Sequence, residues 1–182
     1  MKTSGVFLMM LLLVSGGVVS AQNNPCAAEA QSQMDFWVGD WQLSWPGPQT
    51  GLPEDSLGRG RNHIARVLGG CIVQENFENL QSGYAGKSWS TYSAPRGTWQ
   101  QTWVDNQGGY LVFTGGMEGA EMILKTAPVN RDGKTIVNRM VFRDIAANSF
   151  KWHWQRSEDG GKTWTDRWVI RYERAEPLSE KG

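Results

Sequence analysis

The chain of 182 residues carries 18 Lys and Arg against 18 Asp and Glu, so its formal net charge at pH 7 is zero. This balance argues against a nucleic-acid partner held through phosphate contacts and against an anionic membrane surface, since both require a basic face. Ten tryptophans are unusual in a chain of this length, and they either fill a core or line a pocket.

Residues 1–21 have the pattern of a signal peptide. Lys2 supplies the positive start, residues 7–14 form an apolar run too short for a membrane span, and Val19-Ser20-Ala21 is a small-residue cleavage site. Residues 23–25, Asn-Asn-Pro, precede Cys26 and do not form a lipobox. We therefore expect an exported protein, periplasmic or extracellular. Cleavage leaves 161 residues with a net charge of −1, no second hydrophobic span and enough length for one domain.

The two cysteines, Cys26 and Cys71, predict a disulfide in an oxidising compartment. The chain-entropy estimate for a closed loop of about 46 residues is a stabilisation of about 4 kcal/mol. No His or second Cys lies near either thiol in the sequence, so we predict no metal site there.

The composition of residues 22–35 is typical of a short helix, because residues 25–34 are rich in Ala, Glu and Gln. The rest of the chain consists of short β-type runs separated by turn residues, among them Gly69-Gly70 and Asp132-Gly133. The predicted strands cover residues 40–45, 60–68, 71–78, 86–94, 98–105, 109–115, 121–126, 135–144, 149–156 and 163–174.

These strands follow one another without a helix-length segment between them, so neighbours should pair antiparallel as a meander. About ten strands favour an all-β, up-and-down barrel over residues 36–174, because closure removes exposed edges. Residues 46–58, with three prolines, form a loop that we expect at the rim or as a lid. Residues 175–182 are polar and are expected to form a flexible tail.

Alternation along each strand predicts which side chains face inward, if the tryptophan-bearing faces form the interior. The predicted inward sets are Trp99, Gln101 and Trp103; Phe150, Trp152, Trp154 and Arg156; and Trp164, Asp166, Trp168, Ile170 and Tyr172. Glu75 shares a face with Val73 and Phe77. An aromatic interior with a few polar groups suits a ligand pocket, and it suits a filled core equally well.

Five segments carry a family resemblance that covers nearly the whole mature chain: residues 36–41 (FWVGDW), 68–75, 86–88, 97–105 and 157–164. They resemble an uncharacterised family numbered 1579 among the domains of unknown function. More distantly, Gly39-Asp40-Trp41 is similar to the G-x-W motif of lipocalins and other calycins, in which the Trp packs against an Arg of the last strand. Arg171 or Arg174 is the expected partner here. The resemblance implies a lipocalin-like barrel that binds a small apolar molecule, and it implies no established reaction.

Residues 157–164 also fit the Asp-box pattern S-x-D-x-G-x-T-W of sialidase-type propellers. One copy cannot form a propeller, so we interpret this segment as a hairpin-stabilising device in which Asp159 caps the turn amides. Asp105 similarly begins a turn and is expected to cap it.

The two histidines are placed differently by alternation. His153 falls on the outer face and is expected to be solvated, whereas His63 could face inward with Ala65 and Val67. An inward His is what haem ligation requires, as in nitrobindin-like barrels, but we predict no cofactor. The sequence contains no zinc-type His/His/Glu spacing, nucleophile elbow or phosphate loop.

Glu75 is the carboxylate with the clearest chemical potential. Inside an aromatic barrel it would be desolvated, which would raise its pKa and allow general acid or base chemistry near neutral pH. The alternative is a structural ion pair with Arg61 or Arg139 on a neighbouring strand. Arg139 could instead anchor a ligand carboxylate by a two-pronged hydrogen bond.

Three functional hypotheses follow. In the first, the barrel binds a small hydrophobic or aromatic molecule, with stacking walls from Trp103, Trp152, Trp154 and Trp168 and a polar end oriented by Glu75, Gln101 and Arg139. In the second, the cavity belongs to a metal-free isomerase, lyase or hydrolase that uses Glu75 as acid or base with assistance from His63. In the third, the barrel is filled and serves as a structural or interaction domain.

Overall fold

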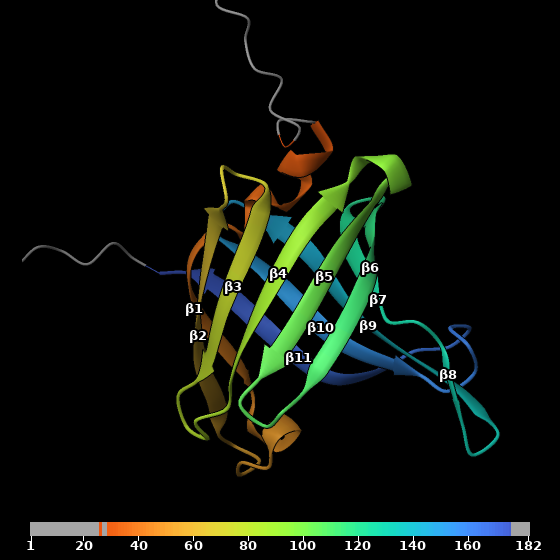
Figure 1. The fold of residues 1–182 in the computed structure, drawn as a ribbon. Helices are drawn as coiled ribbons and strands as arrows, with labels where there is room; N and C mark the ends of the chain where they lie inside the picture. Colours follow the sequence, from red (N-terminus) through yellow and green to blue (C-terminus); the bar gives the residue numbers. More distant parts are fainter. Residues whose placement is uncertain (1–25, 27–28, 176–182) are drawn as a thin grey trace, which may run out of the picture.

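The computed structural model describes Cys26 and residues 29–175 (Figure 1). The predicted signal peptide and all but the first residue of the predicted C-terminal tail lie outside the described residues. The described chain consists of strands with three short 3₁₀ helices, η1 (Glu29–Trp37), η2 (Gly47–Thr50) and η3 (Ala94–Arg96).

The strands are β1 (Gly39–Pro46), β2 (Leu57–Val67), β3 (Ile72–Asn79), β4 (Ala85–Ser93), β5 (Thr98–Asp105), β6 (Tyr110–Glu118), β7 (Glu121–Lys125), β8 (Val129–Arg131), β9 (Lys134–Ala146), β10 (Ser149–Ser157) and β11 (Thr165–Arg174). Ten of them correspond to the predicted strands. The exception is β8, whose three exposed residues give too short a pattern to detect.

The sheet closes into an antiparallel barrel, which confirms the predicted fold class. Strands β1 to β7 pair in sequence order, β9 pairs with both β7 and β10, and β11 pairs with β10 and β1. This circuit contains ten strands. The remaining strand, β8, pairs only with β9 and forms a hairpin that extends beyond the barrel wall (Figure 1).

The aromatic segment at the start of β1 closes one end of the barrel. The Trp41 indole is buried and donates a 2.7 Å hydrogen bond to the carbonyl of Trp37. The Arg174 guanidinium lies 4.2 Å from the centre of the Trp41 ring and donates a 3.0 Å hydrogen bond to the Val38 carbonyl. Of the two expected partners of Trp41, the structure selects Arg174. A Cβ at Gly39, whose φ is 131°, would lie 2.3 Å from the Arg174 guanidinium, so the glycine permits this approach.

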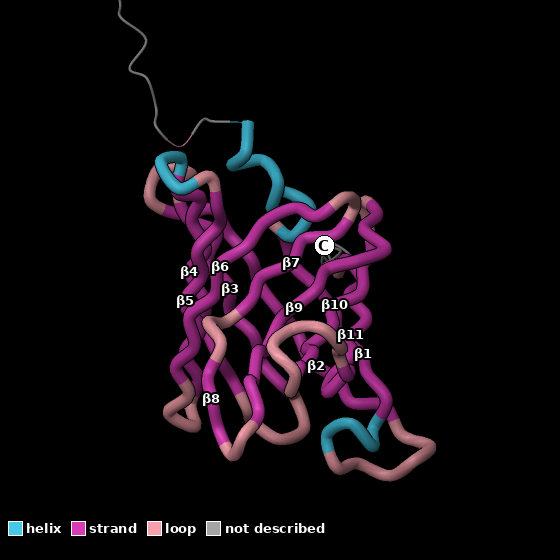
Figure 2. Tube along the Cα trace, turned by 90° about the vertical axis from the view of Figure 1, so that its right-hand side faces the viewer, coloured by secondary structure: helices cyan, strands magenta, loops and turns pink. Residues whose placement is uncertain are grey.

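The N-terminal segment packs over the same end. The short helix expected within residues 22–35 is present as the 3₁₀ helix η1, which begins at Glu29 and ends at Trp37, and its Met34 and Trp37 are buried. Phe36 and Trp37 contact Phe142 edge to face at 5.7 and 5.1 Å. The predicted disulfide between Cys26 and Cys71 is present and ties this segment to the connection between β2 and β3. Figure 2 shows η1 and η2 at opposite ends of the barrel.

A β-bulge reverses part of the predicted facing in β11. Trp154 opposes Trp168, but the next pair is Gln155 with Asp166, so Arg167 is an extra residue. The prediction that Asp166 faces inward is therefore wrong, since its carboxylate bonds the outer-face residues Gln155 and His153 at 2.8 and 3.1 Å. His153 lies on the outer face as predicted, but it is buried under this network rather than solvated.

The Asp-box segment forms the predicted turn device. Asp159 accepts hydrogen bonds of 3.0 Å from the backbone amides of Lys162 and Thr163, and Ser157 accepts one of 2.7 Å from the amide of Gly161. Its aromatic residue, Trp164, packs under the guanidinium of Arg139 at 3.9 Å.

Candidate ligand-binding cavity

The barrel interior contains a cavity of about 250 Å³. Its lining residues are Glu75, Phe77, Tyr84, Trp103, Asp105, Leu111, Phe113, Met140, Trp152, Trp154, Trp168 and Tyr172. Tyr84 and Asp105 lie at the β3–β4 and β5–β6 connections, whereas η1 contacts the opposite ends of these strands through the Gln33–Trp99 hydrogen bond. The cavity therefore lies toward the end of the barrel that η1 does not cover.

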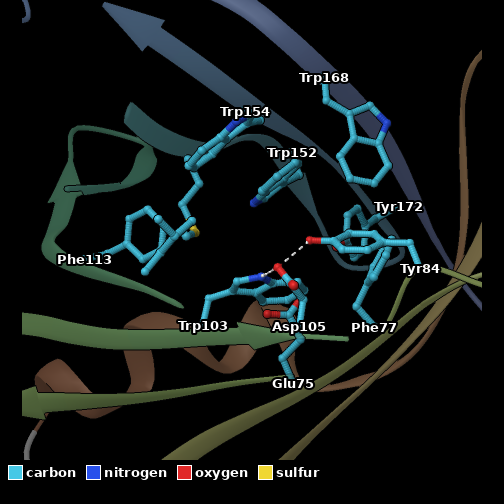
Figure 3. A pocket seen from close by; sticks show the side chains of 12 residues that line it. Glu75, Phe77, Tyr84, Trp103, Asp105, Phe113, Trp152, Trp154, Trp168 and Tyr172 are labelled. Carbon is cyan, nitrogen blue, oxygen red and sulfur yellow. Dashed lines mark hydrogen bonds between the residues drawn. The ribbon is translucent and has the colours of Figure 1, made fainter. Parts of the chain in front are cut away.

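Four tryptophans predicted as stacking walls line this cavity: Trp103, Trp152, Trp154 and Trp168 (Figure 3). The rings of Trp152 and Trp154 are nearly parallel, with centres 6.3 Å apart and planes at 6°. Trp168 meets Trp152 edge to face at 5.9 Å. These ring contacts hold the apolar walls in place.

Trp103 is fixed by a glycine behind it and a carboxylate beside it. A Cβ at Gly86 would lie 2.0 Å from the indole, so only glycine leaves room for the ring at this position. The indole N–H donates a 3.0 Å hydrogen bond to Oδ2 of Asp105. The plane of Trp103 is thus set by both β4 and the β5–β6 turn.

Asp105 connects the turn to the cavity. Its Oδ2 accepts a second hydrogen bond, of 3.0 Å, from the Tyr84 hydroxyl, and its Oδ1 accepts two from the amides of Gln107 and Gly109. Partial burial acts to raise the pKa of Asp105, but these hydrogen bonds and the one from Trp103 outweigh it and hold the pKa below its usual value. Burial and the adjacent carboxylate raise the pKa of Tyr84 to about 12.

Glu75 is buried inside the barrel, as predicted from alternation. Its Oε1 accepts a 2.7 Å hydrogen bond from the Asn62 amide, and its Oε2 accepts a 2.6 Å hydrogen bond from the Ser88 hydroxyl. Burial raises the pKa of Glu75 to about 7, because the loss of hydration outweighs these two hydrogen bonds. The alternative of an ion pair is wrong: Arg61 pairs with Glu78 on the outer face at 2.8 Å.

Further polar side chains continue from Glu75 across the interior. The Asn62 amide also donates a 3.1 Å hydrogen bond to the hydroxyl of Tyr172. Gln101 is buried as predicted, but it donates to Ser90 at 2.8 Å and is not among the residues that line the cavity. The Oδ1 of Asn62 and the Oε1 of Gln101 have no hydrogen-bond partner in the described part of the chain.

Two predicted site residues lie outside the barrel. His63 was expected to face inward, but the register of β2 with β1 places Asn62 and Ile64 inside, and His63 is exposed beside Asp40 at 2.6 Å. On the outer face, Nε of Arg139 donates a 2.6 Å hydrogen bond to Oε1 of Gln155, and the guanidinium lies beside Trp164. Neither side chain reaches the cavity, so His63 cannot ligate haem or assist Glu75 there, and Arg139 cannot anchor a ligand inside.

Sequence reasoning did not identify Tyr84, Asp105 or Tyr172 as cavity residues. Tyr172 was predicted to face inward, so alternation already carried that signal. Asp105 begins a turn, and nothing in the sequence shows that its second oxygen serves a tyrosine on another connection. Among the described residues, no group of three or more His, Cys, Asp or Glu side chains is arranged to hold a metal ion.

An outer hollow of about 300 Å³ adjoins the cavity. Tyr84 and Trp168 line both spaces, so these two rings lie between the cavity and the exterior. Thr50 and Leu52, from the loop predicted at the rim, line the outer hollow. This loop is held to β11 by a 2.8 Å hydrogen bond from the Val169 amide to Gln49.

No helix within residues 29–175 has the length and apolar character needed to cross a membrane. Comparison of the chain with profiles of known protein families found no match, and comparison with curated proteins found none.

Proposed function

We propose that this protein is an exported binding protein that holds a small, largely apolar or aromatic molecule in the barrel cavity. The observation that carries the proposal is the 250 Å³ space walled by four indoles, with one buried carboxyl group of near-neutral pKa. An apolar cavity of about 150 Å³ suffices for benzene. A cavity of this size therefore suits a molecule of one or two rings.

The arrangement of the walls supports binding over a purely structural role. A filled barrel would leave no space among its inward side chains, whereas here the rings support one another around a cavity. Preformed walls lower the ordering cost of binding. A ligand would enter from the outer hollow, past the rings of Tyr84 and Trp168.

Two further observations support the rest of the proposal. The disulfide is typical of a protein that folds outside the cytosol, which agrees with the signal-peptide pattern. The Trp41–Arg174 contact is the arrangement that the calycin resemblance implies. We accordingly propose membership of the family numbered 1579 among the domains of unknown function, within a calycin-like fold.

Glu75 favours one alternative, a metal-free enzyme in the same cavity. A carboxyl group with a pKa of about 7 is suited to donate or accept a proton at neutral pH. Isomerase, lyase or hydrolase chemistry would then rest on Glu75 without His63. Glu75→Gln separates the two functions, because an enzyme would lose turnover while keeping its affinity for the ligand.

The proposal is tested by native mass spectrometry of the protein purified from the envelope or medium of its own host, beside a denatured control. We expect an adduct of one- or two-ring size that is lost on denaturation. Trp103→Leu should weaken the adduct, whereas Trp89→Leu, on the outer face of β4, should not. An adduct that survives denaturation or is equally weakened by both substitutions would contradict the proposal.

A further inference from the structure

The residues that line the cavity have an uneven distribution of charge. Eight of the twelve carry aromatic rings, two are the carboxylic acids Glu75 and Asp105, and the other two are Leu111 and Met140. No Lys, Arg or His is among them. Every charge that the lining can carry near neutral pH is therefore negative.

We propose that the ligand is an organic cation, an amine or quaternary ammonium on a small aromatic or alkyl body, with Glu75 as its counter-ion. This inference rests on the proposed binding function and specifies the chemical class of the ligand. It also replaces the expectation that Arg139 would anchor a ligand carboxylate, since Arg139 lies on the outer face.

Among residues 29–175, no charged side chain pairs with the Glu75 carboxylate. Its carboxyl group accepts one hydrogen bond at each oxygen, from the neutral side chains of Asn62 and Ser88. Each carboxylate oxygen can accept a further hydrogen bond. A buried carboxylate is costly unless a positive charge compensates it, and a ligand ammonium group in the cavity would supply that charge.

Asp105 has a different role from Glu75 in the proposed binding of a cation. Its two oxygens already accept four hydrogen bonds, from Tyr84, Trp103, Gln107 and Gly109. It therefore serves to hold the turn and the rings, while its charge adds to the negative potential at the same wall of the cavity. Figure 3 shows Glu75 and Asp105 both close to the Trp103 ring.

The aromatic walls supply the second half of cation recognition. Trp103, Trp152, Trp154 and Trp168 surround the space, and a cation over an indole face is attracted by the ring quadrupole. This attraction is largest where water is excluded. Rings around a buried carboxylate thus favour an ammonium group over a neutral group of the same shape, and both carboxylates oppose an anion.

Binding of a cation should depend on pH through Glu75. The other titratable groups that line the cavity are Asp105, Tyr84 and Tyr172, and both tyrosine pKa values are raised, so neither ionises near neutral pH. Because the pKa of Glu75 is about 7, its carboxyl group is largely neutral below that pH. Amine affinity should therefore fall as the pH is lowered through 7, while affinity for a neutral molecule should not.

The test compares three probes of similar shape: phenethylamine, 2-phenylethanol and 3-phenylpropionate. Each is titrated into the disulfide-bonded protein and followed by NMR above pH 7. We expect the amine to bind at least about tenfold more tightly than the alcohol, and the propionate to bind most weakly. In Glu75→Gln the amine should lose this advantage, whereas Glu78→Gln, the same change on the outer face of β3, should retain it.

The outcomes separate this inference from the proposed function. Binding of the alcohol as tightly as the amine would overturn the cation assignment and leave a small-molecule barrel. Amine preference that persists in Glu75→Gln, or that is unchanged below pH 7 in the unmodified protein, would overturn Glu75 as counter-ion. Failure of all three probes to bind would count against the proposed function itself.

Discussion

The hydroxyl of Ser88 donates a 2.6 Å hydrogen bond to the carboxyl group of Glu75 from the neighbouring strand, inside the barrel. With Asn62 on the other side, Glu75 is held by neutral donors and sits among aromatic rings. The site therefore keeps the carboxyl group in place but compensates only part of its lost hydration.

The free energy of unfolding should decrease with rising pH because of Glu75. Its pKa is about 7 in the folded protein and about 4.5 in the unfolded chain, so between these values the folded state binds more protons. Protonation of Glu75 adds about 3 kcal/mol to the free energy of unfolding at low pH, and this stabilisation is fully lost above pH 7. Glu75→Gln should lack this decrease when unfolding is measured by denaturant titration at several pH values.

The matched control for that experiment is Glu78→Gln. Glu78 is on the outer face of the same strand and pairs with Arg61, so its substitution should leave the pH dependence intact. If the free energy of unfolding has the same pH dependence in Glu75→Gln and in the unmodified protein from pH 4.5 to 7, the buried carboxyl group does not cause the decrease in stability.

Ser88→Ala should raise the pKa of Glu75 further above 7. The Ser88 hydrogen bond favours the charged carboxylate, so its loss favours the neutral form. Carbon-13 NMR titration of the Glu75 carboxyl group measures this shift directly. Ser90→Ala is the control, because Ser90 is equally buried on β4 but bonds Gln101. An unchanged or lowered pKa in Ser88→Ala would show that this bond does not stabilise the charge.

Gly86→Ala should destabilise the protein by about 1–3 kcal/mol, because the new methyl group overlaps the Trp103 ring. Displacement of this ring should also weaken binding of a cavity probe. Gly116→Ala is the control, since the nearest atom to its added Cβ is 4.0 Å away. Equal thermal denaturation midpoints for both variants would mean that Trp103 does not depend on Gly86.

Arg174→Met should cost about 2 kcal/mol of unfolding free energy. It removes the stacking on Trp41 and leaves the carbonyl of Val38 without its donor. Arg171→Met removes an exposed arginine paired with Glu173 and should change stability by no more than about 0.5 kcal/mol. Similar losses in urea denaturation would contradict a special role for Arg174.

Reduction of the Cys26–Cys71 disulfide should lower the free energy of unfolding by about 4 kcal/mol. The disulfide closes a loop with a sequence separation of 45 residues, and this restricts the unfolded chain. Denaturant titrations with and without a thiol reductant measure the difference. A double Cys→Ala variant should match the reduced protein and show no response to reductant. An unmodified protein equally stable in both conditions would contradict this contribution.

Alternation and turn residues were sufficient to predict the barrel and most of its interior. They placed Glu75, Trp103 and Trp152 correctly because β3 and β5 pair with β4 in an unbroken register, and β10 pairs with β11 in an unbroken register up to Trp154. Asp166 was placed wrongly because the bulge at Arg167 inserts one residue, and a pattern of period two cannot locate such an insertion.

The remaining errors concern relations between strands. His63 and Asn62 are adjacent polar residues, and only pairing with β1 decides which of them faces inward. Arg139 precedes Met140, which lines the cavity, and the choice between these neighbouring positions depends on the register of β9 with β7 and β10. The Tyr84–Asp105 hydrogen bond joins two connections far apart in the sequence, so no local pattern indicates it.

The central claim is that a small molecule binds among the four cavity tryptophans. It is tested most directly by fluorine-19 NMR of protein labelled with 5-fluorotryptophan, with the ten resonances assigned by single Trp→Phe variants. Phenethylamine and 2-phenylethanol are titrated separately. We predict that at least one probe shifts the resonances of Trp103, Trp152, Trp154 and Trp168, while those of Trp89 and Trp164 on the outer surface stay unchanged. Shifts confined to Trp89 and Trp164, or no shift with either probe, would contradict the claim.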